Sequence, residues 1–211
     1  DGTVGLICVT TPVSNTAYMV ARTACSTTRM ASNETDFSIA VPTTAISIVK
    51  TQTGGGGVGE PVTYQIDVTN SGAVVIDDML LVDTVSPVVT GVTTTEPGGF
   101  APPVVTPTAS GTRYVWSAAG VGFAPGNTLT FTVNGTMGLV CATRAVSNTA
   151  YVAGKNVCTE VRALSNVVGS VIAAPVQSIM IVKNQIPAAP VSLGPITYQI
   201  VVTNNGAMTI D

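Results

Sequence analysis

The sequence repeats itself at an offset of about 133 residues, and no other feature limits its possible folds as strongly. Several short segments recur at this offset: Ser14-Asn15-Thr16-Ala17-Tyr18 as residues 147–151, Ile48-Val49-Lys50 as residues 181–183, Cys8 as Cys141, and Cys25 as Cys158. After a one-residue insertion near residues 187–194, the offset is 134, and Thr63-Tyr64-Gln65-Ile66 returns as residues 197–200. A long, regular repeat is typical of modular arrays, whose function comes from length and assembly.

The repeat divides the 211 residues into one complete unit and two partial ones. We expect residues 1–44 to be the C-terminal part of a preceding repeat, residues 45–178 a complete repeat, and residues 179–211 the N-terminal part of a following repeat. Two chains joined at these partial units would still lack the equivalents of residues 78–133. We therefore favour a window on a longer protein, and the alternative is completion of exposed edges by strands of neighbouring chains.

The composition favours β-structure throughout, because Thr and Val are abundant and apolar positions alternate or run in short β-branched blocks. Strands are predicted over residues 45–50, 62–69, 74–82, 88–94, 112–117, 128–133, 146–152 and 165–173. About eight strands at this spacing indicate an all-β, two-sheet sandwich with Greek-key connections. Trp116 is expected in its core.

Several classes of function are disfavoured. The sequence has no histidine, which removes Ser-His-Asp and Cys-His chemistry and the commonest metal ligand. The net charge is −3 and the eight basic residues form no patch, so nucleic acid is not an expected partner. No apolar run approaches the ~18 residues of a membrane-spanning helix. Gly54-Gly55-Gly56-Gly57 lacks the ending of a phosphate-binding loop, so we expect a plain loop and no cofactor.

Six motifs, taken in order, resemble the conserved-repeat module called domain of unknown function eleven. They are Ile-Val-Lys-Thr (48–51), Val-Thr-Tyr-Gln-Ile-Asp-Val-Thr-Asn-Ser-Gly (62–72), Leu-Val-Asp-Thr (81–84), Trp116, Pro-Gly-Asn-Thr-Leu-Thr-Phe-Thr-Val (125–133) and Ser-Asn-Thr-Ala-Tyr-Val (147–152). The resemblance implies tandem immunoglobulin-like Greek-key β-sandwiches in secreted and cell-surface proteins of bacteria and archaea. The family pattern does not require the Gly/Pro-rich segment 95–111, which is expected to be a surface loop.

The cysteines predict one disulfide in each repeat, Cys8 with Cys25 and Cys141 with Cys158, because each pair is 17 residues apart at a fixed place. Free buried thiols are the alternative. Disulfides would place the protein outside the cytoplasm, in an oxidising compartment.

The sharpest hypothesis is a self-formed amide bond between Lys50, on the first strand of the complete repeat, and Asn148, on a late strand. Such bonds, known in surface-pilin sandwiches, need a buried lysine beside an asparagine and an acid that shuttles protons. Burial would make the lysine nucleophilic by lowering its pKa. Asp83 is the preferred acid and Asp67 the second choice. Alternatively, the lysine is exposed and the asparagine caps a turn.

Other polar residues are weaker candidates. Asp77, Asp78 and Asp83 could supply carboxylates to calcium, but their spacing matches no recognised calcium loop, and no metal is predicted. Asn33 and Asn134 begin the glycosylation sequons Asn-Glu-Thr and Asn-Gly-Thr.

The sequence thus favours a non-enzymatic structural subunit of an extracellular filament or cell-surface array, which polymerises with copies of itself. The alternative is the stalk of a large surface adhesin whose binding domain lies elsewhere. A glycan-active enzyme is disfavoured, because such enzymes need two carboxylates across a cleft and acidic residues are few here.

Overall fold

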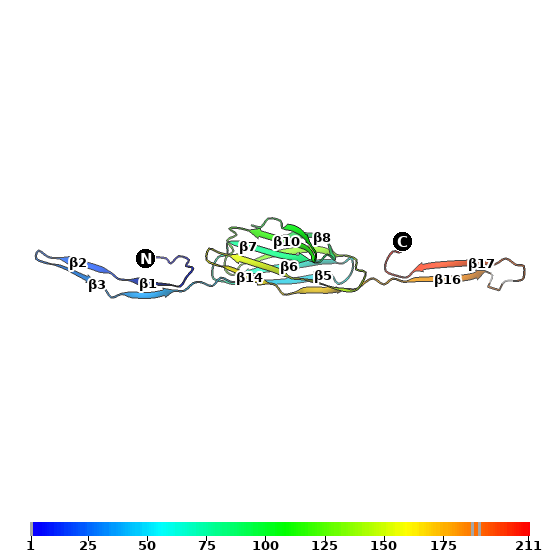
Figure 1. Cartoon of the computed structure of the whole chain (residues 1–211), viewed down its shortest axis with the longest axis horizontal. Coiled ribbons are helices and arrows are strands. Elements are labelled where there is room, and N and C mark those ends of the chain that lie inside the picture. Colours follow the sequence, from blue (N-terminus) through cyan, green and yellow to red (C-terminus); the bar gives the residue numbers. More distant parts are fainter. Residues whose placement is uncertain (1, 187, 190) are drawn as a thin grey trace.

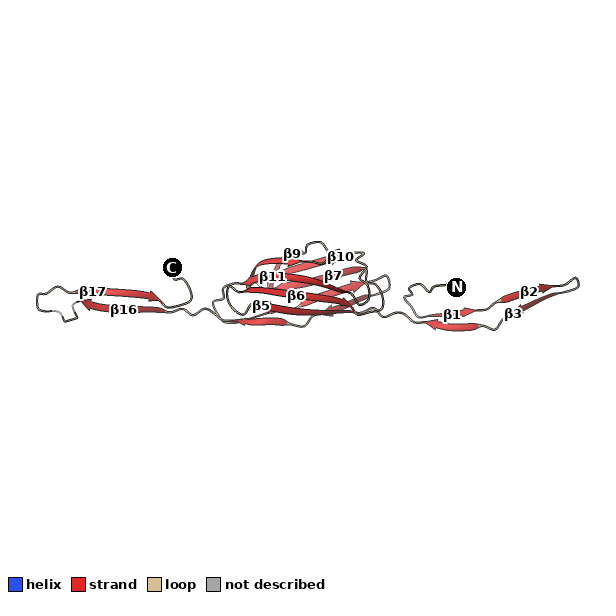
Figure 2. Ribbon diagram, turned by 180° about the vertical axis from the view of Figure 1, so that it is seen from behind, coloured by secondary structure: helices blue, strands red, loops and turns tan. Residues whose placement is uncertain are grey.

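A computed structural model describes residues 2–186, 188–189 and 191–211, and every regular element in these residues is a β-strand (Figure 2). The predicted all-β fold is therefore confirmed. The insertion predicted near residues 187–194 falls partly on residues 187 and 190, which lie outside the described residues. No described segment forms a helix long and apolar enough to cross a membrane.

The central part of the chain forms a β-sandwich from which a thin segment extends at each end (Figure 1). Its strands are β5 (Ile46–Gly54), β6 (Pro61–Asn70), β7 (Asp78–Val85), β8 (Val89–Thr95), β9 (Val104–Thr108), β10 (Gly111–Ala118), β11 (Thr128–Met137), β12 (Arg144–Asn148), β13 (Ala150–Lys155), β14 (Glu160–Leu164) and β15 (Val168–Ile172). One sheet has the order β5-β6-β11-β8 and the other β14-β13-β7-β10-β9, while β12 pairs with β15. All of these pairings are antiparallel.

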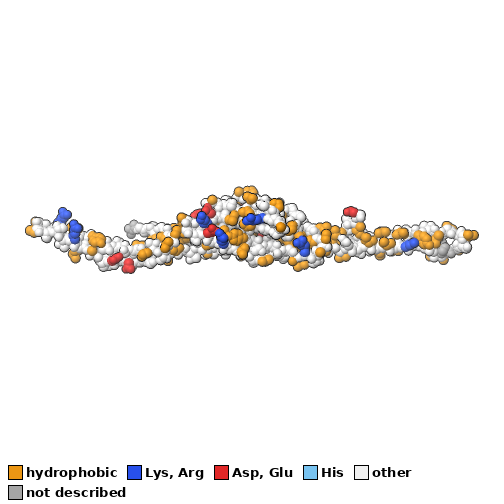
Figure 3. Space-filling view, in the orientation of Figure 1, with side chains coloured by type: hydrophobic (Ala, Val, Ile, Leu, Met, Phe, Trp, Pro, Cys, Tyr) orange, Lys and Arg blue, Asp and Glu red, His pale blue; other side chains and the backbone are white. Residues whose placement is uncertain are grey.

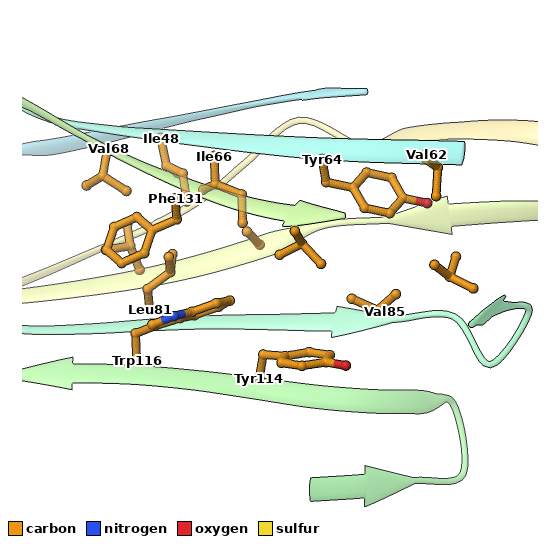
Figure 4. Close-up of a cluster of buried hydrophobic side chains, with 14 of the residues drawn as sticks. Ile48, Val62, Tyr64, Ile66, Val68, Leu81, Val85, Tyr114, Trp116 and Phe131 are labelled. Carbon is orange, nitrogen blue, oxygen red and sulfur yellow. The ribbon is translucent and has the colours of Figure 1, made fainter. Parts of the chain in front are cut away.

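The core lies between the two sheets and follows from the alternation of apolar and polar residues along the strands. In β6, Val62, Tyr64, Ile66 and Val68 are buried while the residues between them face outward. The facing sheet contributes Leu81 and Trp116, and the Trp116 ring lies 5.6 Å from that of Phe131 in β11 (Figure 4). Trp116 is fully buried, as expected for a core aromatic.

The structure differs from the sequence prediction mainly at the sheet edges. Strand β9 lies within the segment predicted to be a loop, and its five residues are all exposed and include Pro107. Strand β14 was also not predicted, and it too is the outer strand of its sheet. Edge strands bury little apolar surface, so their sequences lack the alternation that identifies inner strands. The predicted strand 146–152 is interrupted at Thr149 and divides into β12 and β13, which join different sheets.

The two end segments keep the strand pairing of their counterparts in the sandwich. In the N-terminal segment, β1 (Thr11–Asn15) pairs with β4 (Thr35–Ile39) and β2 (Tyr18–Arg22) with β3 (Thr27–Ala31), as β12 does with β15 and β13 with β14. In the C-terminal segment, β16 (Ile179–Ile186) pairs with β17 (Thr197–Asn204) as β5 does with β6. Apolar side chains lie along both segments (Figure 3). The repeat boundaries remain a prediction.

The chain enters the sandwich at one end and leaves it at the opposite end (Figure 1). We call the end beside residues 40–45 the leading end, where Asn156 Nδ2 donates to Thr44 Oγ1 at 3.0 Å. We call the end beside residues 173–178 the trailing end, where Arg144 pairs with Ile172. Strands β12 and β13 together run from the trailing end to the leading end.

Equivalent isoleucines test how far burial differs between the sandwich and the C-terminal segment. Ile66 is 0% exposed and its counterpart Ile200 is 62% exposed. We expect Ile66→Ala to lower the free energy of unfolding by about 2–5 kcal/mol, because it leaves a cavity. Ile200→Ala should change it by less than about 0.5 kcal/mol. Urea denaturation followed by fluorescence of Trp116, the single tryptophan, measures both. Equal effects would contradict the exposure of β17.

Candidate functional site

Three polar side chains from three different strands meet inside the sandwich. Lys50 Nζ lies 2.6 Å from Asp83 Oδ1, and Asn148 Nδ2 donates to Asp83 Oδ2 at 3.2 Å. Lys50 is 1% exposed, Asp83 0% and Asn148 3%. The structure therefore brings together the lysine, the asparagine and the preferred acid named from the sequence.

Strand alternation explains why each of these residues faces inward. Along β5 the buried positions are Ile46, Ile48 and Lys50. Along β7 they are Met79, Leu81, Asp83 and Val85, and along β12 they are Val146 and Asn148. A period of two thus places a charged or amide side chain at a position of each strand that otherwise takes apolar residues.

Burial makes the Lys50 amine unusually easy to deprotonate. Removal from water lowers the pKa of Lys50, and the charge and hydrogen bond of Asp83 oppose this effect only in part. Two tyrosines lie close to the pair: Lys50 Nζ is 5.1 Å from the centre of the Tyr64 ring, and Tyr114 in β10 is the register partner of Asp83 in β7. The pKa values of Tyr64 and Tyr114 are raised, first by burial and then by the Asp83 charge.

The carboxamide of Asn148 is only partly satisfied. Its Oδ1 atom is buried and has no hydrogen-bond partner in the part of the chain that the structure describes. A buried carbonyl oxygen without a donor is energetically costly and leaves a place for a proton carried by a neighbouring acid. The arrangement supplies an amine, an amide carbon and a carboxyl group that can move a proton between them.

Asn166, which the sequence analysis did not identify, holds the backbone of Lys50 in place. Its Oδ1 accepts from Lys50 N at 2.9 Å, and its Nδ2 donates to Lys50 O at 2.8 Å. The neighbouring Ser165 Oγ accepts from Ala150 N at 2.9 Å, beside the end of β12. The only sequence signal is that Ser32-Asn33 precedes this Ser-Asn pair by 133 residues.

The other acidic candidates do not assemble a site. Asp67 accepts hydrogen bonds from Gln65 and Thr130 on the outer face of its sheet, away from Lys50. Asp83 is engaged by Lys50, so it does not join Asp77 and Asp78 as a calcium ligand. Among the residues that the structure describes, no group of three or more His, Cys, Asp or Glu side chains could hold a metal ion.

The predicted disulfide pairing is wrong. Cys8 is bonded to Cys158, with an S–S distance of 2.00 Å and a Cα–Cα distance of 5.0 Å. Cys25 and Cys141 are free and exposed. The physical reason is the direction of the intervening chain: Cys141 lies near the trailing end and Cys158 at the leading end, because β12 and β13 carry the chain along the sandwich. Seventeen residues of nearly extended chain separate the two thiols rather than bringing them together.

The two glycosylation candidates remain predictions. Asn134 lies within β11, where its Oδ1 accepts from Thr63 Oγ1 at 2.8 Å. Asn33 is exposed in the N-terminal segment, at the repeat position of Asn166.

No family model matches the chain. No curated protein matches it either. Among solved structures, it is similar to the major pilin SpaA of Corynebacterium diphtheriae, a modular pilus subunit with stabilizing isopeptide bonds (14% identity, 69% of this chain and 46% of that chain, TM-score 0.45). It is also similar to the major pilin BcpA of Bacillus cereus (10% identity, 82% of this chain and 65% of that chain, TM-score 0.46). A third similar structure is the C-terminal domain of the antigen I/II-family protein AspA of Streptococcus pyogenes (12% identity, 78% of this chain and 55% of that chain, TM-score 0.36). The chain spans less than two thirds of each of these structures, and the similarity concerns the fold alone.

Replacing Asn166 tests its role in holding Lys50. We expect Asn166→Ala to lower the free energy of unfolding of the sandwich by about 1–3 kcal/mol, because both backbone groups of Lys50 lose a partner. Asn33→Ala is the matched control, since Asn33 occupies the same repeat position in the N-terminal segment, which has no counterpart of β5. Urea denaturation compares the two variants. Equal losses in the free energy of unfolding would argue against a role of Asn166 in holding the backbone of Lys50.

Proposed function

We propose that the chain is a structural, non-enzymatic subunit of an extracellular filament or cell-surface array, and that an amide bond between Lys50 and Asn148 braces its sandwich. The observation that carries this proposal is the buried cluster of Lys50, Asp83 and Asn148 in a sandwich that the chain traverses from end to end. A cross-link between Lys50 and Asn148 would strengthen the sandwich, which would transmit tension along an array.

The proposed reaction needs no oxidant and no cofactor. A proton passes from Lys50 Nζ to Asp83, and the free amine attacks Cγ of Asn148. A C–N bond forms to Nζ while the bond from Cγ to Nδ2 breaks, and Nδ2 leaves as ammonia. Of the three ammonium hydrogens, one stays on the new amide, one leaves with the ammonia and one remains on Asp83. The product therefore holds a neutral amide and a neutral acid.

Intact mass spectrometry tests the amide bond directly. With the disulfide reduced, we expect the chain to weigh less than its sequence by the mass of one ammonia, and trypsin to leave Lys50 uncut and joined to the peptide 145–155. Asp83→Ala and Asn148→Ala should restore the full mass, because the first removes the proton carrier and the second removes the electrophile.

Matched controls come from the end segments. Lys183→Ala and Asn15→Ala change the residues at the same repeat positions as Lys50 and Asn148, and neither should alter the loss of ammonia from the sandwich. A full mass in the unmodified, folded chain would contradict the amide bond.

Stretching single molecules by their ends tests the mechanical role. The Cys8–Cys158 disulfide must first be reduced, because it would by itself keep residues 9–157 out of the path of the force. In the reduced chain the amide bond would remove residues 51–147 from that path, so unfolding should release roughly 340 Å less chain than in reduced Asn148→Ala, at about 3.5 Å per residue. Equal extensions would show that the sandwich is not braced between these strands.

The assembly can be identified separately by electron microscopy of native material. Long homopolymers would support the filament. Short stalks attached to cells and ending in a different domain would favour the adhesin alternative instead.

A further inference from the structure

The disulfide joins two different repeats rather than closing a loop within one. Cys8 and Cys158 are 150 residues apart in the sequence, more than the length of one repeat. Cys8 occupies the repeat position of Cys141, and Cys158 occupies the repeat position of Cys25. The bonded pair thus combines the first cysteine position of one repeat with the second position of the next.

The place of Cys158 explains this connection. It lies in the turn between β13 and β14 at the leading end, where its amide donates to Asn156 Oδ1 at 2.8 Å. Asn156 also contacts Thr44, which belongs to the linker from the preceding segment. The second cysteine position therefore faces backward along the chain, toward the repeat that comes before.

Cys141 faces the opposite way. It lies between β11 and β12 at the trailing end, two residues before Thr143, whose Oγ1 accepts from Ala174 N of the outgoing linker at 3.2 Å. Cys8 holds the same position before β1, and there the thiol is bonded. Cys141 is exposed and free.

We propose that Cys141 forms a disulfide with the second-position cysteine of a repeat adjoining the trailing end. Cys25 would likewise bond a first-position cysteine of a repeat adjoining the far end of the N-terminal segment. We call the resulting series of disulfides the ladder, and Cys8–Cys158 is one link of it because it joins the same two cysteine positions. In the ladder every repeat is covalently tied to the next. The proposal rests on the tandem array of the proposed function but not on the amide bond.

The reaction at Cys141 is an ordinary thiol–disulfide exchange. Two thiols lose two protons and two electrons, and a small-molecule disulfide such as oxidised glutathione accepts them and becomes two thiols. The second cysteine can come from a further repeat of the same chain or from the exposed Cys25 of a second copy. Both sources present a thiol in the turn at the leading end of a repeat.

The test uses chains in which only two cysteines remain, treated with oxidised glutathione. In the first, residues 1–178 are followed by residues 45–211, which adds one repeat, and the cysteines kept are Cys141 of the first sandwich and Cys158 of the added one. We expect this monomer to join its two cysteines in one disulfide that carries no glutathione. In the matched control, the 211-residue chain carries Cys8→Ser and Cys25→Ser, which leaves Cys141 and Cys158 of one sandwich. In this monomer the two cysteines should not bond to each other, and each should remain a thiol or carry a glutathione.

The 211-residue chain with all four cysteines tests the other source. A disulfide between copies would join the tryptic peptides 114–144 and 23–29, in excess over links of either peptide to itself. An intrachain bond in the longer chain, or this link between copies, supports the ladder and identifies the source. Free Cys141 in both chains, with Cys8–Cys158 formed in the 211-residue chain, would overturn it. The ammonia loss, read from the same spectra, reports separately on the amide bond.

Discussion

The ion pair between Lys50 and Asp83 is the constraint on which the rest of the sandwich depends. An isolated ammonium or carboxylate in an apolar interior is strongly unfavourable, and removing one member of a buried pair leaves the other uncompensated. Lys50 belongs to the four-stranded sheet and Asp83 to the five-stranded sheet, so their 2.6 Å contact fixes one sheet against the other. A register slip of one residue in β5 or β7 would move one charge to the outer face and leave its partner buried alone.

The same burial that makes this pair costly also provides the driving force for the proposed bond. Desolvation lowers the pKa of Lys50 and so favours the amine over the ammonium. After the reaction neither charge remains in the core, because the lysine nitrogen becomes an amide and Asp83 becomes a neutral acid. Condensation therefore removes the electrostatic penalty that folding creates. A surface lysine, already solvated by water, would gain nothing comparable.

The sequence predicts the features that depend on local alternation of apolar and polar residues. It does not predict the features that depend on the direction in which the chain runs. Inner strands such as β6 and β11 were identified from their period of two, and the repeat drew attention to Lys50 and Asn148. The edge strands β9 and β14 were missed because they bury too little to carry that pattern. The predicted disulfide pairing was wrong for a different reason. Residue spacing gives only the separation of two cysteines along the chain. It does not show that β12 and β13 carry the chain from one end of the sandwich to the other. Asn166 bonds a strand 116 residues away, and such a contact leaves no periodic signal.

The hairpin of β16 and β17 separates what the local sequence determines from what the complete sandwich adds. Lys183 Nζ lies 4.3 Å from the centre of the Tyr198 ring, much as Lys50 lies over Tyr64, so two strands alone reproduce this contact. Yet Lys183 is exposed, and no carboxylate pairs with it among the described residues. Removal of the amine from water and the supply of an acid both require the facing sheet. The chemistry proposed for Lys50 therefore cannot begin in a hairpin and must wait until β7 and β12 have packed, which would confine the cross-link to repeats that have already folded.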